Sequence, residues 1–151
     1  MIRFILYTIS LIAVVVVALS VYVRYAPTDP GQWNVPVAST DPVLAGPCAD
    51  KIKFLPHGAR ASCLVPGTPA EVLAKLDAIA TAAPRTHGIA ATDGLATWES
   101  RSQLMGFPDY ITAQVVAAPE GTRLDIFSRQ RFGGGDMGVN AARLRDWLSQ
   151  L

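Results

Sequence analysis

The sequence predicts an α+β fold: an N-terminal single transmembrane helix, then a helix, a four-stranded antiparallel meander and a C-terminal helix packed on the sheet. Three observations lead to this expectation. A capped amphipathic segment begins at Thr68, two hairpin signals follow it within residues 86–132, and an apolar stripe closes the chain. At 151 residues the chain has room for one domain of ordinary size.

Residues 4–23 form the apolar part of an expected transmembrane anchor, residues 1–25. They contain no charged side chain, and about 20 apolar residues cross a bilayer as a helix. A small-x-small stretch at residues 18–20 offers the alternative of a cleaved signal peptide, but the apolar run exceeds the roughly 7–15 residues of such signals. Arg3 and Arg24 flank the run, and the free amino terminus tips the balance toward a cytoplasmic N-terminus. We therefore expect a bacterial inner-membrane protein that contacts the lipid bilayer through residues 4–23, with a periplasmic C-terminal domain.

Charge and cysteine content narrow the possible partners. The net charge is +1 at pH 7. Of the 13 Lys and Arg residues, Arg3 and Arg24 precede residue 25, which leaves 11 in the rest of the chain against 12 Asp and Glu, so this part is nearly neutral. Because nucleic-acid binders usually show a basic stripe, no nucleic acid is expected. Cys48 and Cys63, the only cysteines, form either a disulfide outside the cytoplasm or two unpaired, partly buried thiols. Neither a metal nor a cofactor is expected, because the cysteines and histidines lack the spacing of a zinc site.

Residues 26–47 are expected to be a proline-rich tether between the anchor and a domain spanning residues 48–151. Proline removes amide donors and fixes φ, which argues against a helix or a central strand. The segment contains Pro27, Pro30, Pro36, Pro42 and Pro47. It also has apolar residues that we expect to lie along the domain surface: Trp33, Val35, Val37 and Leu44.

The first helix of the domain is expected from Thr68 to about Ala83. Thr68, Pro69 and Glu71 fit a capping box with proline at the first helical position. An apolar stripe follows at helical spacing, and Pro84 ends it. Its members are Val72, Leu73, Leu76, Ile79 and Ala80.

Two hairpins are expected next. Asp93-Gly94 predicts a two-residue turn that places Thr92 opposite Leu95 and Ile89 opposite Trp98. The resulting sheet has one apolar face, and a polar face with Thr97, Glu99 and Arg101.

The second hairpin is expected to turn at residues 119–121, with glycine in the left-handed position of a three-residue loop. If Ala118 opposes Thr122, then Asp109 comes opposite Arg131, and the two are expected to form an ion pair. Neither face of this hairpin is cleanly apolar in that register. Either a bulge interrupts it or both faces are partly covered.

The chain is expected to end in a helix that packs Leu144, Trp147, Leu148 and Leu151 on the sheet, with Asp136 or Asn140 as its cap.

Gly133, Gly135 and Gly138 precede this helix in a G-x-G-x-x-G pattern. A dinucleotide site also requires a βαβ unit and a later acidic residue, and neither follows here. The pattern therefore indicates a tight strand-to-helix reversal. A second interpretation is an anion site, because free amides at a helix start attract anions and Arg129 and Arg131 precede the loop.

Two stretches resemble the family known as domain of unknown function 1499. Its first motif is matched by Gly106, Phe107 and Asp109, and its second by Ser128, Arg131, Gly133, Asp136, Gly138, Asn140 and Arg143. The chain departs from the family pattern at Tyr110, Gln130 and Ala141. The resemblance covers about residues 60–151 and implies no activity.

These observations favour a membrane-anchored, extracytoplasmic module that binds or scaffolds at the membrane surface, with an anionic ligand or a membrane protein as partner. We expect the binding residues to be Asp109, Arg131, Asp136 and Asn140. The sequence does not contain a G-x-S-x-G elbow or a Cys-His pair of known spacing, so an enzyme is the less favoured class. The alternative to a binding or scaffolding module is a hydrolase or transferase acting around Asp109, Arg131 and Asp136.

Overall fold

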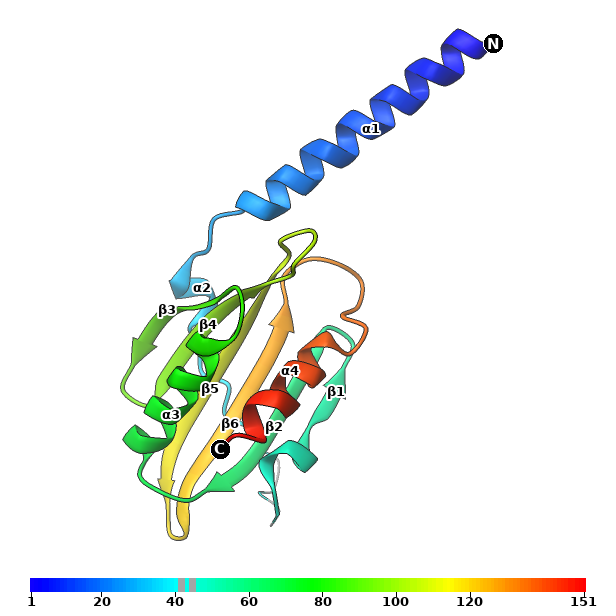
Figure 1. Ribbon diagram of the computed structural model, residues 1–151. Helices are drawn as coiled ribbons and strands as arrows, with labels where there is room; N and C mark the ends of the chain where they lie inside the picture. The colour runs from blue at the N-terminus through cyan, green and yellow to red at the C-terminus, as the bar shows by residue number, and fades with distance from the viewer. Residues whose placement is uncertain (41–42, 44–45) are drawn as a thin grey trace.

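The computed structural model describes residues 1–40, 43 and 46–151. The domain is built on a six-stranded antiparallel sheet with the strand order β1-β2-β6-β5-β4-β3 (Figure 1). The strands are β1 (Lys53–Leu55), β2 (Gly58–Val65), β3 (Thr86–Thr92), β4 (Leu95–Arg101), β5 (Pro108–Ala118) and β6 (Gly121–Gln130). The expected α+β class is confirmed. The four-stranded meander is wrong, because β2 pairs with β6 and β1 pairs with β2.

Two helices cover one face of the sheet, α3 (Pro69–Ala82) and α4 (Val139–Leu148) (Figure 1). The apolar core lies between them and the strands. Trp98 of β4 and Trp147 of α4 meet edge to face, with 5.9 Å between ring centroids. The Trp98 indole also donates to Asp77 of α3 at 2.8 Å, so this buried ring has a hydrogen-bond partner. From the expected C-terminal stripe, the core contains Leu144, Trp147 and Leu148.

Helix α3 begins as its sequence predicts. The Thr68 hydroxyl accepts a hydrogen bond from the Glu71 amide, and the Glu71 carboxylate accepts one from the Thr68 amide at 2.8 Å. Pro69 takes the first helical position, where its missing amide has no cost. The helix buries one side of its apolar stripe, through Val72, Leu76 and Ala80.

The β3–β4 hairpin follows the expected pairing only next to its turn, where Thr92 faces Leu95. A register shift after Gly88 then places Trp98 opposite Gly88 rather than Ile89. A β-bulge of this kind inserts one extra residue into a strand, which the alternation of side chains does not reveal.

The register expected for the β5–β6 hairpin is wrong by one residue. Its turn contains two residues, so Ala118 faces Gly121 rather than Thr122. Gly121 joins the strand at a φ of 128°, and a side chain there would lie 2.6 Å from the Val65 carbonyl oxygen of β2. The pairing is therefore shifted by one residue, and Gln130 instead of Arg131 lies opposite Asp109. A shift of one residue also exchanges the two faces of a strand.

The other face of the sheet is covered by the segment 26–39, which crosses it on the side opposite α3 and α4 (Figure 1). It includes the short helix α2 (Pro30–Trp33), so the expectation that prolines exclude a helix here is wrong. Pro30 occupies the first helical position, where proline is compatible with a helix. Val37 is buried and Val35 is exposed. Pro42 and Leu44 lie outside the described residues.

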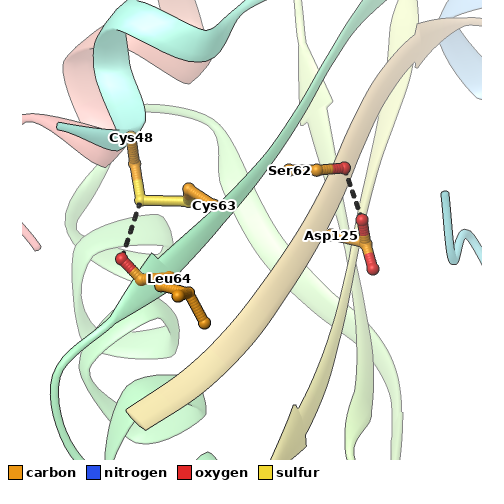
Figure 2. Close-up of a disulfide and its surroundings, with 5 residues drawn as sticks. All are labelled: Cys48, Ser62, Cys63, Leu64 and Asp125. Atoms are coloured by element: carbon orange, nitrogen blue, oxygen red, sulfur yellow. Dashed lines mark hydrogen bonds between the residues drawn. A yellow bond between two sulfur atoms is a disulfide. The ribbon is translucent and has the colours of Figure 1, made fainter. Parts of the chain in front are cut away.

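A disulfide joins Cys48 of the 3-10 helix η1 (Cys48–Lys51) to Cys63 of β2 (Figure 2). Of the two alternatives open from the sequence, the bonded one is present. The preceding residue of the strand, Ser62, faces the opposite side of the sheet and donates to Asp125 of β6 (Figure 2). The disulfide therefore fixes η1 to the helix-covered face.

Helix α1 (Ile2–Tyr25) projects away from the domain (Figure 1), and none of its residues is buried. Among the described residues it is the one helix long and apolar enough to cross a membrane.

Candidate functional site

Five polar residues from both matched motifs gather where β5 begins, β6 ends and α4 starts. We refer to them as the α4 cluster: Asp109, Ser128, Asp136, Asn140 and Arg143. The Arg143 guanidinium lies at its centre, donating to Asp109 Oδ2 at 3.0 Å, Asn140 Oδ1 at 2.8 Å and Ser128 Oγ at 3.2 Å. The Ser128 hydroxyl also donates to Asn140 Oδ1. Three separate segments are thus joined through one arginine.

The turn before α4 positions the remaining member. Gly133 and Gly138 adopt φ values of 106° and 81°, in the region that glycine enters without steric cost. The Asp136 carboxylate accepts hydrogen bonds from the amides of Gly138 and Asn140, both at 3.1 Å. Asp136 therefore satisfies free amides at the start of the helix, as one of the two expected caps. Asn140 instead lies inside the helix and is buried.

The two carboxyl groups of the α4 cluster differ in acidity. Burial raises the pKa of Asp109, partly offset by the charge and hydrogen bond of Arg143 and reinforced by the negative charge of Asp136. Burial also acts to raise the pKa of Asp136, but hydrogen bonds from the Gly138 amide and from Asn140 outweigh it and lower that pKa. This division is the one that acid–base chemistry uses.

One donor in the cluster is unused. Asn140 Nδ2 is buried and donates no hydrogen bond of normal geometry, although the Asn140 side chain lies close enough to Asp136 to help lower the pKa of that carboxyl group. A buried polar group without a partner is uncommon and calls for an explanation. Within the described residues there is no group of three or more His, Cys, Asp or Glu that could hold a metal ion.

Arg131 does not join the α4 cluster. It lies on the other face of the sheet, where its guanidinium donates to the Pro27 carbonyl at 2.7 Å and to the Tyr110 hydroxyl at 3.3 Å. The expected ion pair between Asp109 and Arg131 is therefore wrong, and Arg143 takes the place of Arg131. The cause is the shorter turn described above. Of the four expected binding residues, the structure brings together Asp109, Asp136 and Asn140.

A second group of polar and aromatic residues lies between the segment 26–39 and the sheet, and the sequence analysis did not predict that these residues come together. Trp33 stacks on Tyr110 with 3.9 Å between ring centroids, and the Arg129 guanidinium lies 5.3 Å from the Trp33 ring. Arg129 also donates to the Trp33 carbonyl at 2.6 Å, and burial lowers its pKa. Thr28 donates to Glu99 on the same face. The available signal was the row of polar residues on β4 together with a tryptophan in a proline-rich segment.

The end of α1 is joined to the domain by Arg101 of β4. Its guanidinium donates to the carbonyl oxygens of Arg24 at 2.8 Å, Ala26 at 3.3 Å and Gly106 at 3.1 Å, and pairs with Glu99. The carbonyls that end a helix lack partners within the helix and carry partial negative charge, so an arginine there is favourable.

The fit between α1 and the β4–β5 loop is close. Gly106 has a φ of 70°, and a side chain there would lie 3.0 Å from Arg24 Cγ. Tyr22 of α1 meets Phe132 edge to face, with 6.2 Å between centroids. Two separate loops of the domain therefore contact the last turn of the helix.

Comparison with known proteins identifies the family of the chain. The family model described as "Protein of unknown function (DUF1499)" matches residues 37–151. No curated protein and no solved structure matches the chain.

Proposed function

We propose that this chain, which belongs to the DUF1499 family, is a single-pass membrane-anchored module whose domain lies outside the cytoplasm and binds at the membrane surface. Residues 1–25 would be the anchor, 26–47 the tether and 48–151 the domain. The length and hydropathy of α1 support a membrane span. The setting proposed is the inner membrane of a bacterium, with the domain in the periplasm.

The contact of Arg101 with the last carbonyls of α1 carries this proposal. If a signal peptidase cut after Ser20, residues 21–25 alone would remain of α1, too few to hold a helix by themselves. The carbonyl groups that Arg101 contacts would then lose their helical arrangement. The disulfide supports the external location, because disulfides persist in the periplasm and are rare in the cytoplasm.

Two measurements test this topology. Alkaline phosphatase fused after Leu151 should be active, because it folds only outside the cytoplasm, and green fluorescent protein at the same position should be dark. The intact mass of the membrane-extracted chain should include α1. A fluorescent fusion, or a mass lacking residues 1–20, would refute the external location or the retained anchor respectively.

Within the domain, the proposed ligand-binding residues are Asp109, Asp136 and Asn140. The unused donor Asn140 Nδ2 supports this assignment, since a ligand acceptor would satisfy it. Arg131, also expected from the sequence to bind, is left out because it lies on the opposite face.

A hydrolase or transferase at the same residues is the second candidate. The observation that favours it is the opposite shift in the pKa values of Asp109 and Asp136, since one carboxyl group could act as acid and the other as base. Substrate profiling of the full chain should then find a turnover that Asp136→Ala abolishes and that Asp146→Ala, an exposed change in α4, leaves intact. A turnover equal in all three proteins would exclude this site.

A further inference from the structure

A cavity of about 390 Å³ opens at the junction between α1 and the domain. It is lined by the end of α1, by the start of β3 and by the loop that joins β4 to β5. Its lining includes Arg24, Arg85, Thr86, His87 and Ser102. We call it the junction cavity. It is separate from the α4 cluster.

The junction cavity is positively charged. Arg101 also lines it, but its charge is matched by Glu99. Arg24 and Arg85 have no such match: within the described part of the chain, Arg24 donates only one long hydrogen bond, 3.5 Å to the Leu104 carbonyl, and Arg85 donates from Nε to the Arg101 carbonyl at 3.1 Å. Their other N–H groups are available to a ligand. No carboxylate is among the described residues that line the cavity.

The chemistry of the lining points to a phosphate group. Arginine presents a planar set of donors that matches phosphate oxygens, and two such groups beside a hydroxyl and an imidazole suit a compact anion. Arg85 holds a φ of 56°, a left-handed conformation that is uncommon outside glycine. Such backbone conformations are found at ligand sites more often than elsewhere.

The location decides where this phosphate comes from. Arg24 directly follows the apolar run 4–23, and a helix of about 20 residues is about 30 Å long, the thickness of the hydrocarbon core. The junction cavity therefore lies at the depth of the lipid headgroups. Tyr25, which also lines it, is a residue type enriched at that depth.

We infer that the junction cavity binds the phosphate of an anionic phospholipid headgroup, held by Arg24 and Arg85, in the leaflet where α1 ends. This rests on the proposed function, because it requires α1 to be retained and to span the bilayer. A lipid held there contacts the anchor and the domain together, and so fixes the domain against the membrane surface.

The test is native mass spectrometry of the full chain in detergent, titrated with phosphatidylglycerol or with phosphatidylcholine. The wild type should bind phosphatidylglycerol at least about tenfold more tightly, because both lipids carry a phosphate but phosphatidylcholine also brings a trimethylammonium charge, which the uncompensated Arg24 and Arg85 repel. Arg24→Gln with Arg85→Gln should abolish the preference. Arg3→Gln with Arg145→Gln removes the same charge elsewhere and should keep it.

Folding and ligand source are controlled in the same experiment. The double lysine variant, Arg24→Lys with Arg85→Lys, keeps the charge and should retain part of the preference, so a general loss of fold is distinguished from loss of the site. Equal binding of both lipids by the wild type, or an unchanged preference in the glutamine variant, overturns the inference. Displacement of the lipid by equimolar inorganic phosphate overturns the lipid assignment. Since the titration is done in detergent, its result is independent of the fusion assay that tests topology.

Discussion

Arg143 of α4 and Asp109 of β5 form an ion pair 3.0 Å long, with each side chain 14% exposed. The pair connects the C-terminal helix to the strand that begins the central hairpin. Arg143 also contacts Ser128 at the end of β6, so one guanidinium joins the helix to two neighbouring strands. The largest effect of this ion pair should therefore be on the stability of the domain.

Breaking this pair should be costly. Arg143→Met should lower the free energy of unfolding by about 2–4 kcal/mol, because it leaves the Asp109 carboxylate without its partner, and Asp109→Asn should lower it by less, because burial already opposes the charge of Asp109. Urea unfolding followed by tryptophan fluorescence measures the loss, because Trp98 and Trp147 are buried. The double variant should lose less than the sum of the two. Arg145→Met, an exposed change in the same helix, should cost below about 0.5 kcal/mol. A strictly additive double variant would show that the two side chains do not interact.

Local sequence signals predicted the elements that local physics determines. Thr68 and Glu71 mark the start of α3, and Asp93-Gly94 marks a turn, because cap and turn geometries depend on a few adjacent residues. The β5–β6 hairpin has a shorter turn than the one expected, and it places Gly121 so close to β2 that a side chain there would lie 2.6 Å from the Val65 carbonyl oxygen. The sequence did not predict β2.

Long-range contacts also explain the error in the candidate site. The sequence contains both motifs, but which arginine reaches Asp109 depends on the sheet face to which each residue points. Arg143 carried a helical rather than a strand signal, so counting along a hairpin could not select it. The segment 26–39 shows the same limit, because its contacts are to strands far away in sequence.

Asp136 should make stability depend on pH. Because its pKa is lowered in the folded state, the carboxylate contributes stability that is fully present above its unfolded pKa and is lost as pH falls through the lower folded value. Asp136→Asn should cost about 0.3–1 kcal/mol at pH 7, because asparagine keeps an oxygen that can accept from the amides but removes the negative charge at the start of the helix. The difference between the variant and the wild type in the free energy of unfolding should disappear as the pH falls below about 4, the ordinary pKa range of an aspartate. Unfolding curves between pH 7 and pH 2 measure it, with Asp146→Asn as the matched charge removal. A gap that stays constant with pH would contradict this role.

Asp109 should change the stability with pH in the direction opposite to Asp136. Its folded pKa is raised, so its contribution is fully present below the unfolded pKa and is lost as pH rises through the folded value. Asp109→Asn should therefore cost more in acid, relative to its cost at pH 7, than Asp136→Asn does. Comparing the two variants over the same pH series isolates the sign. Parallel curves for the two variants would refute the assignment of opposite shifts.

The disulfide between Cys48 and Cys63 should be a main source of stability for η1. It closes a loop with a sequence separation of 15, for which the chain-entropy model gives about 3 kcal/mol. Replacing both cysteines by alanine should lower the free energy of unfolding by about that amount. Dithiothreitol should bring the wild type to the same midpoint in urea and leave the variant unchanged. If the reductant shifts both proteins equally, its effect does not come from this bond.

The segment 26–39 should be held on the sheet by Gln114 of β5. The Gln114 Oε1 atom accepts hydrogen bonds from the amides of Val37 and Ala38, both at 3.0 Å. Gln114→Met keeps a similar volume but removes the acceptor, so the two amides should exchange with solvent faster, by about tenfold for a loss near 1.4 kcal/mol. Hydrogen exchange of the full chain in detergent measures this, with Gln150→Met as an exposed control. Because the β5–β6 ladder does not depend on this side chain, its amides should keep their protection. Faster exchange throughout the sheet would mean that the substitution disturbs the core, and unchanged exchange at Val37 and Ala38 would mean that other contacts hold the segment in place.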